Sequence, residues 1–184
     1  MAELAPAEVI AFWRAAGPAR WYTKDDRFDA DIRDKFALLH YAAARGELSG
    51  WADNWQGTLA LLILLDQFPR NMFRGSAHAF ATDPLARSLS AAGLTAGFDQ
   101  ECPADVRVFF YMPLEHSELL ADQEQCVALC QVLDAASGSE WAKWAGIHRD
   151  IIARFGRFPH RNTELGRVST LEEAEFLASG GFSG

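Results

Sequence analysis

The sequence is poor in cysteine and contains no long apolar run. Its 184 residues include three cysteines without the spacing of a disulfide framework, which is typical of a protein of the reducing cytoplasm. The longest apolar run, Leu59 to Leu65, covers seven residues, whereas a membrane-spanning helix needs about 20. Residues 1–10 lack the cationic start and the long apolar segment of a signal peptide. We therefore expect a cytoplasmic protein that does not associate with membranes.

Positive charge is also scarce. The chain has 17 Lys and Arg residues against 25 Asp and Glu residues, so its formal net charge is −8. Binding to the phosphate backbone of a nucleic acid needs an excess of cations, so no nucleic-acid partner is expected. The charges are unevenly spread: residues 99–140 hold nine acids and one base, and residues 149–167 hold five arginines and two acids. Either these two stretches neutralise each other, or something binds between them.

Apolar residues, in contrast, are abundant. Hydrophobic residues make up 49% of the chain and aromatic residues 12%, which excludes disordered and low-complexity classes. They recur at helical spacing between capping residues, prolines and glycines, and no alternating strand pattern occurs. Helices are expected from Pro6 to Gly17, Asp25 to Arg45, Trp51 to Phe68, Thr82 to about Gly93, Ala104 to Met112, Ser117 to Gly138, Glu140 to Phe155, and Ser169 to about Ala178. The fold class predicted from this pattern is all-α.

No change of composition marks a domain boundary. We expect one helical domain over residues 1–184, in which residues 179–184 form a loose tail. Two segments resemble each other: Asp66 to Asn71 and Arg157 to Asn162 both contain Phe-Pro and end in Arg-Asn. This recurrence weakly favours a stack of helix pairs over a globular bundle, although the tetratricopeptide consensus is absent.

These two segments, called the Phe-Pro loops below, carry the main candidate binding residues. Asp66 comes at the C-terminal end of an apolar helix, where the helix dipole disfavours a negative charge, so it needs a cation or several donors. One interpretation is an arginine–carboxylate network that ties helix ends together. The other is a pocket in which arginines bind a carboxylate or phosphate ligand. The candidate ligand-binding residues are Asp66, Arg70, Asn71, Arg74, Asp122, Gln123, Arg157, Arg161 and Asn162.

A second group of polar residues runs from Glu115 through His116 and Glu118 to Asp122 and Gln123. Glu118 and Asp122 share one face of the expected helix, and His116 precedes its first turn. Such a group could hold a hard divalent metal or act as an acid–base pair. Acids in a first helical turn are also ordinary partners of the helix dipole, and pairing with the arginines of the second loop is the preferred interpretation. The candidate catalytic residues are His116, Glu118 and His160; no metal site and no cofactor are expected.

Several blocks of the chain resemble a known family. They are Leu65 to Gly75, Ala79 to Asp83, Phe109 to Pro113 with the His116-Ser117-Glu118 and Asp122-Gln123 groups that follow, and Arg154 to Asn162. Together they look like the signature of the bacterial Domain of Unknown Function 924 family, from Val9 to Leu177. The resemblance implies antiparallel helix pairs in a compact, tetratricopeptide-like right-handed superhelix. It implies no activity.

Two functions are consistent with these residues. The first is a binding or scaffold module that takes a small anionic ligand or a peptide, with arginines for charge and Trp or Phe for apolar contact. The second is an enzyme of unassigned reaction, in which His116 or His160 moves a proton while Arg157 and Arg161 hold an anionic substrate. The sequence leaves the ligand, the reaction and the oligomeric state open.

Overall fold

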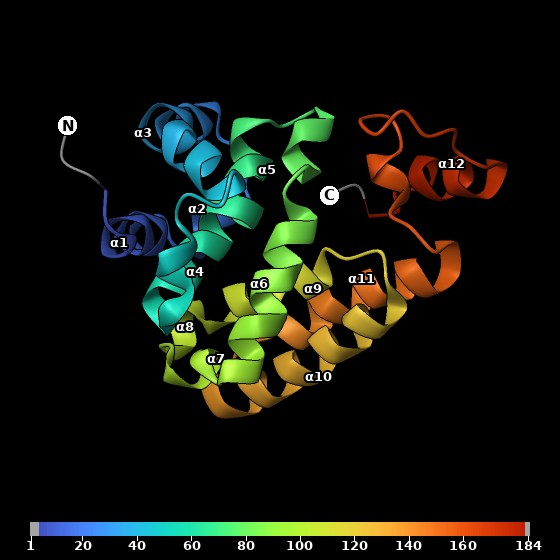
Figure 1. Cartoon of the computed structure of the whole chain (residues 1–184). Helices are drawn as coiled ribbons and strands as arrows, with labels where there is room; N and C mark the ends of the chain where they lie inside the picture. Colours follow the sequence, from blue (N-terminus) through green and yellow to red (C-terminus); the bar gives the residue numbers. More distant parts are fainter. Residues whose placement is uncertain (1–3, 183–184) are drawn as a thin grey trace. The chain divides into compact units, whose positions relative to one another are not determined.

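The structure is a computed structural model that describes residues 4–182, and these residues contain no strand (Figure 1). The all-α prediction is therefore confirmed for the described chain. The α-helices are α1 (Pro6–Ala16), α2 (Pro18–Trp21), α3 (Asp26–Ala44), α4 (Trp55–Leu62), α5 (Phe68–Met72), α6 (Asp83–Ala96), α7 (Phe98–Glu101), α8 (Ala104–Arg107), α9 (Met112–Glu115), α10 (Leu120–Ser137), α11 (Trp141–Phe155) and α12 (Leu171–Ala178). Short 3-10 helices cover Ser49–Asp53, Ala77–Phe80, Val108–Phe110 and Pro159–Arg161, and Ile63–Gln67 is a π-helix.

The chain divides into two compact units, each described here by itself. Unit 1 comprises Met1–Arg74 and His78–Pro113, and unit 2 comprises Gly75–Ala77 and Leu114–Gly184. The predictions of one domain over residues 1–184 and of a tetratricopeptide-like superhelix stay predictions.

Unit 1 is built around an aromatic core. The Trp13 ring of α1 is stacked on Trp21 and Phe28, and it meets the edges of Phe68 and Phe109. All five side chains are buried. Each large aromatic side chain contributes about 2–3 kcal/mol by leaving water, so these contacts hold α1, α2, α3 and α5 together.

Two helices of unit 1 are capped by the polar side chain that precedes them. Asp25 accepts hydrogen bonds from the backbone N–H groups of Arg27 and Phe28, both at 3.0 Å, and so caps α3. Asn54 caps α4 by accepting from the N–H of Gly57 at 3.0 Å. Gly57 has to be glycine, because a Cβ there would lie 1.8 Å from the carbonyl oxygen of Trp51.

The predicted helix from Trp51 to Phe68 differs from the structure in two ways. It is divided into a 3-10 helix, α4 and the π-helix Ile63–Gln67, and helical structure continues through Pro69 into α5 instead of ending there. Proline is tolerated in the first turn of α5 because the carbonyl oxygens one turn before it, of Leu64 and Leu65, form hydrogen bonds with side chains instead of with its missing N–H.

The wider turn of the π-helix changes the pairing of its carbonyl groups, and side chains from elsewhere bind them. The His40 imidazole shares a hydrogen bond of 2.9 Å with the oxygen of Leu64, and the hydroxyl of Thr82 donates to Leu65 at 2.5 Å. Arg70 donates to the oxygen of Asp66 at 2.6 Å. The π-helix is thereby tied to α3, α5 and the start of α6. Thr82 is the N-cap residue of α6, as expected for a helix that starts there, but its hydroxyl serves this contact and makes no capping hydrogen bond.

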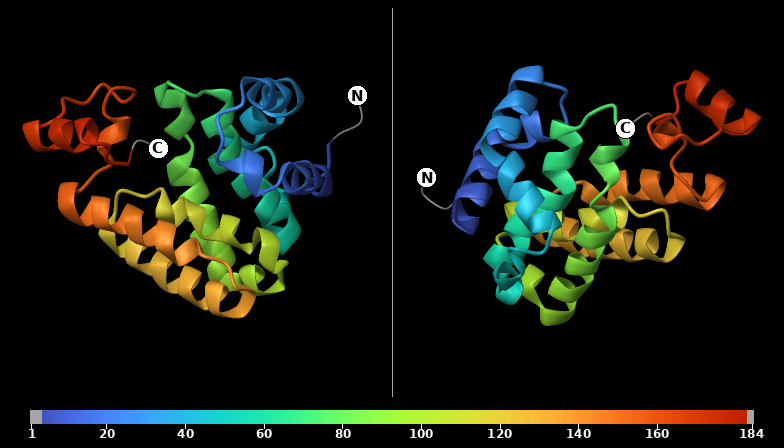
Figure 2. Two further views of the ribbon diagram at one scale, coloured as in Figure 1. Left: turned by 180° about the vertical axis from the view of Figure 1, so that it is seen from behind. Right: turned by 45° about the horizontal axis from the view of Figure 1, so that its top comes forward.

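Unit 2 is organised by the pair α10 and α11, which lie side by side in both views of Figure 2. Asp134 near the end of α10 accepts from the N–H groups of Trp141 and Ala142 at 2.9 and 2.8 Å, and so caps α11. The helix expected from Ser169 begins at Leu171 with a capping box: Glu173 N–H donates to the Thr170 hydroxyl, and Thr170 N–H donates to the Glu173 carboxylate. Ser117, in contrast, lies one turn before α10, which begins at Leu120.

The segment predicted as a loose tail is described as far as residue 182. Gly180 has a φ of +83°, a left-handed conformation that favours glycine, and the N–H of Gly181 donates to the oxygen of Phe176 at 2.9 Å. This turn brings the Phe182 ring to 4.6 Å from the ring of His148. Residues 183 and 184 lie outside the described chain.

Candidate functional site

The first Phe-Pro loop surrounds the buried Asp66. Its carboxylate, 1% exposed, lies 3.3 Å from Nη1 of Arg70 and accepts from the Gln67 amide at 2.5 Å. The guanidinium of Arg70 also donates to both carboxylate oxygens of Asp83, each at 3.0 Å. The cation that Asp66 was expected to need is therefore Arg70, four residues later.

The other two predicted residues of this loop meet a carboxylate that the sequence did not suggest. The Asn71 amide donates to Asp29 of α3 at 2.8 Å, and Arg74 donates to both of its oxygens at 2.9 and 3.2 Å. Asp29 is buried. We call this arrangement the Asp29 triad.

The second Phe-Pro loop contains an equivalent arrangement, the Glu173 triad. Arg157 donates to both oxygens of Glu173 at 2.6 and 2.8 Å, and the Asn162 amide donates to one of them at 3.3 Å. The Glu173 side chain is 3% exposed. The hydrogen bonds from Arg157, and those from Thr170, outweigh burial and lower the pKa of Glu173 to about 2.

Glu118, a candidate catalytic residue, holds another arginine. It accepts from Arg167 at 2.8 and 2.9 Å and from the N–H of Phe158 at 3.0 Å. Burial raises the pKa of Glu118, but the hydrogen bonds from Arg167 and Phe158 and the charges of Arg167 and Arg161 together outweigh it, so this pKa lies below the ordinary value. Glu118 is therefore a carboxylate at neutral pH, able to accept a proton only weakly.

Arg161 and the two candidate histidines belong to the same end of unit 2. Arg161 is buried, lies 4.4 Å above the ring of Phe158, and donates to the backbone oxygen of His116 at 3.0 Å. The His160 ring lies 5.5 Å from Phe158 and 5.4 Å from Phe182. Arg161 and His160, which are consecutive in the chain, thus both pack against Phe158, and His116 contributes its backbone oxygen to Arg161.

Asp122 and Gln123 are both buried on α10. The Gln123 amide donates to the backbone oxygens of Glu115 and Ser117 at 2.5 and 2.6 Å. Its own oxygen is buried and has no hydrogen-bond partner among residues 4–182. Gln123 therefore fixes the backbone that carries Glu115.

Glu115 forms a pair with a histidine that the sequence did not single out. Its Oε1 lies 3.0 Å from Nδ1 of His148, and the same nitrogen lies 2.9 Å from the oxygen of Trp144. Both oxygens only accept when Glu115 is ionised, so Nδ1 carries the proton and Nε2 carries the lone pair of the neutral ring. A carboxylate that orients an imidazole in this way is the support that a general base requires.

The three thiols are buried. Burial raises the pKa of Cys102 to about 12, and the neighbouring Cys130 thiol and burial raise the pKa of Cys126. Cys102 and Cys126 are therefore unreactive thiols in the folded protein. Among residues 4–182, no group of three or more His, Cys, Asp or Glu side chains is placed to hold a metal ion.

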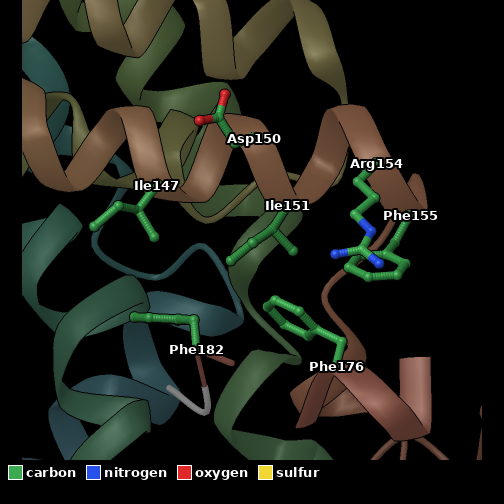
Figure 3. A pocket seen from close by; sticks show the side chains of 7 residues that line it. All are labelled: Ile147, Asp150, Ile151, Arg154, Phe155, Phe176 and Phe182. Atoms are coloured by element: carbon green, nitrogen blue, oxygen red, sulfur yellow. The ribbon is translucent and has the colours of Figure 1, made fainter. Parts of the chain in front are cut away.

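Unit 2 also contains an apolar cavity of about 290 Å³. It is lined by Ile147, Asp150, Ile151, Arg154, Phe155, Phe176 and Phe182. Figure 3 shows Ile147 and Ile151 extending from α11 toward Phe182 and Phe176, whereas the carboxylate of Asp150 points away from them. Arg154 is the cationic member of this lining, and none of the sequence candidates belongs to it.

Comparisons with known proteins agree with the family resemblance noted in the sequence. The sequence model of a family described as bacterial protein of unknown function, DUF924, matches residues 9–181. The chain belongs to the DUF924 family. A solved structure of a protein of unknown function from Agrobacterium tumefaciens is 47% identical, with a TM-score of 0.89 over 95% of this chain and 97% of that one. No curated protein matches.

This DUF924 chain contains no helix within residues 4–182 that is long and apolar enough to cross a membrane. Its site residues that sequence reasoning missed are mostly carboxylates that reach the loops from other helices: Asp29, Asp83 and Glu173. His148 had a usable signal, because it continues the helical stripe that contains Trp144, Ile151 and Phe155. A polar residue within an apolar stripe marks a buried partner, here Glu115.

Proposed function

We propose that unit 2 is a binding module for a small carboxylate with an apolar body, held in the cavity beside Arg154. The observation that carries this proposal is the exposed ion pair of Arg154. Its guanidinium lines an apolar cavity, yet its partner Glu172 is at the surface: the two side chains are 53% and 61% exposed. A ligand carboxylate can therefore replace Glu172 at small cost.

The arginines predicted to bind an anion are less suitable. Arg157 is engaged by Glu173, which is 3% exposed, so an external anion would leave a buried carboxylate without its cation. Breaking such a pair costs about 3–5 kcal/mol. An exposed pair such as Arg154–Glu172 contributes only about 0–1 kcal/mol. This difference supports Arg154 over Arg157 as the anion-binding residue.

The cavity favours an apolar body of modest size. Its volume of about 290 Å³ is just below the range of ~300–1,000 Å³ that ligand pockets occupy. Each buried methylene contributes about 0.8 kcal/mol, so five methylenes contribute more than the exposed charge pair. We therefore expect affinity to increase about fourfold per methylene until the cavity is full, with the charge deciding the orientation.

Calorimetric titration with straight-chain carboxylates from butanoate to decanoate tests the proposal. We expect Arg154→Gln to weaken carboxylate binding by up to about fivefold and to leave binding of the matching alcohols unchanged. Arg149→Gln is the matched control, since Arg149 lies on the same helix and pairs with Asp150 without lining the cavity. Equal losses in both variants, or no binding by the wild type, would contradict the proposal.

A peptide ligand makes a different prediction. A peptide would place one apolar side chain in the cavity and its C-terminal carboxylate or an acidic side chain at Arg154. We would titrate the same two arginine variants with the dipeptide Leu-Phe and with its C-terminally amidated form, which lacks the carboxylate. A peptide ligand is indicated if the dipeptide binds more tightly than the straight-chain acids and amidation weakens its binding.

The second candidate function is an enzyme, and the Glu115–His148 pair is the observation that favours it. In this reaction His148 Nε2 takes a proton from water while the water oxygen attacks an ester carbon. The ester C–O bond then breaks, and the proton passes to the departing alkoxide. The carboxylate of Glu115 stabilises the imidazolium that forms in between.

Hydrolysis of 4-nitrophenyl acetate by the purified protein tests this second function. We expect His148→Gln and Glu115→Gln to abolish hydrolysis while circular dichroism shows a retained fold. If His160→Gln or His116→Gln abolished hydrolysis instead, the general base would be one of the histidines that the sequence suggested. Unchanged rates in all four variants would exclude proton transfer by these residues.

A further inference from the structure

Unit 1 contains a buried imidazole with an unused lone pair. His40 lies on α3 and is 0% exposed. Its Nδ1 is 2.9 Å from the backbone oxygen of Leu64, which can only accept, so Nδ1 carries the proton and Nε2 carries the lone pair. Nε2 is buried and has no hydrogen-bond partner among the described residues. A buried acceptor without a donor is uncommon and calls for an explanation, such as a bound ion.

A second imidazole lies nearby. The ring centroids of His40 and His78 are 6.3 Å apart. His78 belongs to the 3-10 helix Ala77–Phe80, is exposed, and is stacked on Phe73 at 4.2 Å. The Tyr41 ring lies 6.1 Å from His78 and 5.2 Å from His40. One imidazole is therefore fixed in the interior, and the other faces solvent beside it.

The separation is close to what a shared metal ion requires. With metal–nitrogen bonds of about 2.0–2.1 Å, two imidazoles on one tetrahedral ion have ring centroids about 5 Å apart. The observed distance exceeds this by about 1 Å. His78 is exposed, so a small change in its side-chain torsions can close that gap, whereas His40 need not move.

The contact between His40 and Leu64 has the form that supports a metal ligand. Histidines that bind metals usually donate their other N–H to a carbonyl or a carboxylate, which fixes the tautomer and the ring orientation. Here that carbonyl belongs to the π-helix Ile63–Gln67, a type of segment that occurs frequently at functional sites. Two neutral imidazoles select borderline ions such as Cu(II), Ni(II) and Zn(II) over Mg²⁺ and Ca²⁺.

We propose that His40 and His78 together bind one borderline divalent transition-metal ion, with water completing its coordination. This site lies in unit 1 and is independent of the carboxylate site proposed in unit 2. Because the protein supplies only two ligands, the remaining positions on the metal are open to an external ligand. The expected order of affinity is Cu(II) above Ni(II) and Zn(II).

Electron paramagnetic resonance of one equivalent of Cu(II) tests this site in the full chain. We expect a spectrum with hyperfine coupling to two imidazole nitrogens, and binding at least tenfold weaker in His78→Ala. His78 is exposed, so its replacement leaves the fold intact. His116→Ala is the control and should bind like the wild type.

His40→Gln is the second variant, with circular dichroism to check its fold. If this variant folds, its Cu(II) spectrum should show fewer coupled nitrogens than that of the wild type. If it does not fold, the His78→Ala variant alone tests the site. Cu(II) affinity unchanged in His78→Ala, or lost in His116→Ala, would overturn the proposal. So would a spectrum with a single coupled nitrogen in the wild type.

Discussion

The first Phe-Pro loop belongs to unit 1 and the second to unit 2, and in each an asparagine and an arginine share one buried carboxylate. In the Asp29 triad the arginine follows the asparagine, and in the Glu173 triad it precedes it. Both carboxylates lie in the first turn of a helix, α3 or α12. In each loop the recurring asparagine, with an arginine outside the repeated Arg-Asn pair, thus joins the loop to a helix start.

The two joints differ in what else the carboxylate does. Glu173 also caps its own helix by accepting from Thr170 N–H at 2.7 Å. Asp29 instead accepts hydrogen bonds from the side chains of Asn71 in α5 and of Arg74 just after it. The chain continues as an α-helix through Pro69 but forms a 3-10 helix after Phe158. The lesson is that the asparagine of each Arg-Asn pair binds an internal carboxylate together with a different arginine, Arg74 or Arg157, so such a loop need not be an open anion site. This comparison favours the structural interpretation of both loops.

The largest expected effect comes from the aromatic anchors of the two loops. Phe68 and Phe158 are both 0% exposed. Replacing either by alanine should lower the free energy of unfolding by about 3–5 kcal/mol, because a fully buried ring leaves a cavity. Urea denaturation measures both, with the leucine variants as milder controls. A loss below about 1 kcal/mol in one loop would show that the two are anchored differently.

Removal of the shared asparagines should have an intermediate effect. Asn71→Ala and Asn162→Ala each delete a hydrogen bond to a buried carboxylate, and such bonds contribute about 1.5–3 kcal/mol. We expect the Asn71 variant to lose more stability, since its bond is 2.8 Å long against 3.3 Å for Asn162. Urea denaturation of both variants would contradict the comparison if the order were reversed.

The Glu173 triad should also show in the pH dependence of stability. The pKa of Glu173 is about 2 in the folded protein, below its ordinary value of 4.5, so the folded state binds this proton less readily. Its contribution is therefore complete above about pH 5 and is lost as the pH falls from 4.5 toward 2. Urea denaturation at stepped pH should show a shallower slope over this range in Glu173→Gln than in the wild type, in which Glu118 and other carboxylates with lowered pKa values also contribute. Glu172→Gln, which alters an exposed pair of the same helix, should keep the wild-type slope.

The smallest expected effect on stability belongs to Arg154. Because Arg154 and Glu172 are both mostly exposed, Arg154→Gln should change the free energy of unfolding by no more than about 0.5–1 kcal/mol. Thermal and urea denaturation measure it. A larger loss would place Arg154 among the structural arginines of unit 2 and remove the basis for its proposed role in binding.

Local structure was the part that could be predicted from sequence. The capping box of Thr170 and Glu173 depends on residues three apart, and α3 follows from Asp25 and the apolar spacing after it. The helical course through Pro69 could not be predicted, since it depends on the π-helix before it.

Hydrogen-bond partners that are distant in the sequence could not be predicted either. Asp29 lies 42 residues from Asn71, and only the packing of α3 against α5 brings them together. In the same way, Glu118 meets Arg167 across 49 residues. The sequence suggested an arginine–carboxylate network as one of two interpretations, but not which residues would pair, because charge is not specific for a partner.

The π-helix Ile63–Gln67 sets the angular phase of the long helical run that begins at Trp55. A wider turn holds one residue more than an α-turn, so it offsets every later side chain by about 100° around the axis. Residues 57–69 are all buried, so this offset decides which neighbour each side chain meets rather than whether it is buried. Deleting a single residue from the segment would turn Phe68 away from Trp13 without altering either side chain. The number of residues in this run is thus a determinant of the core in its own right.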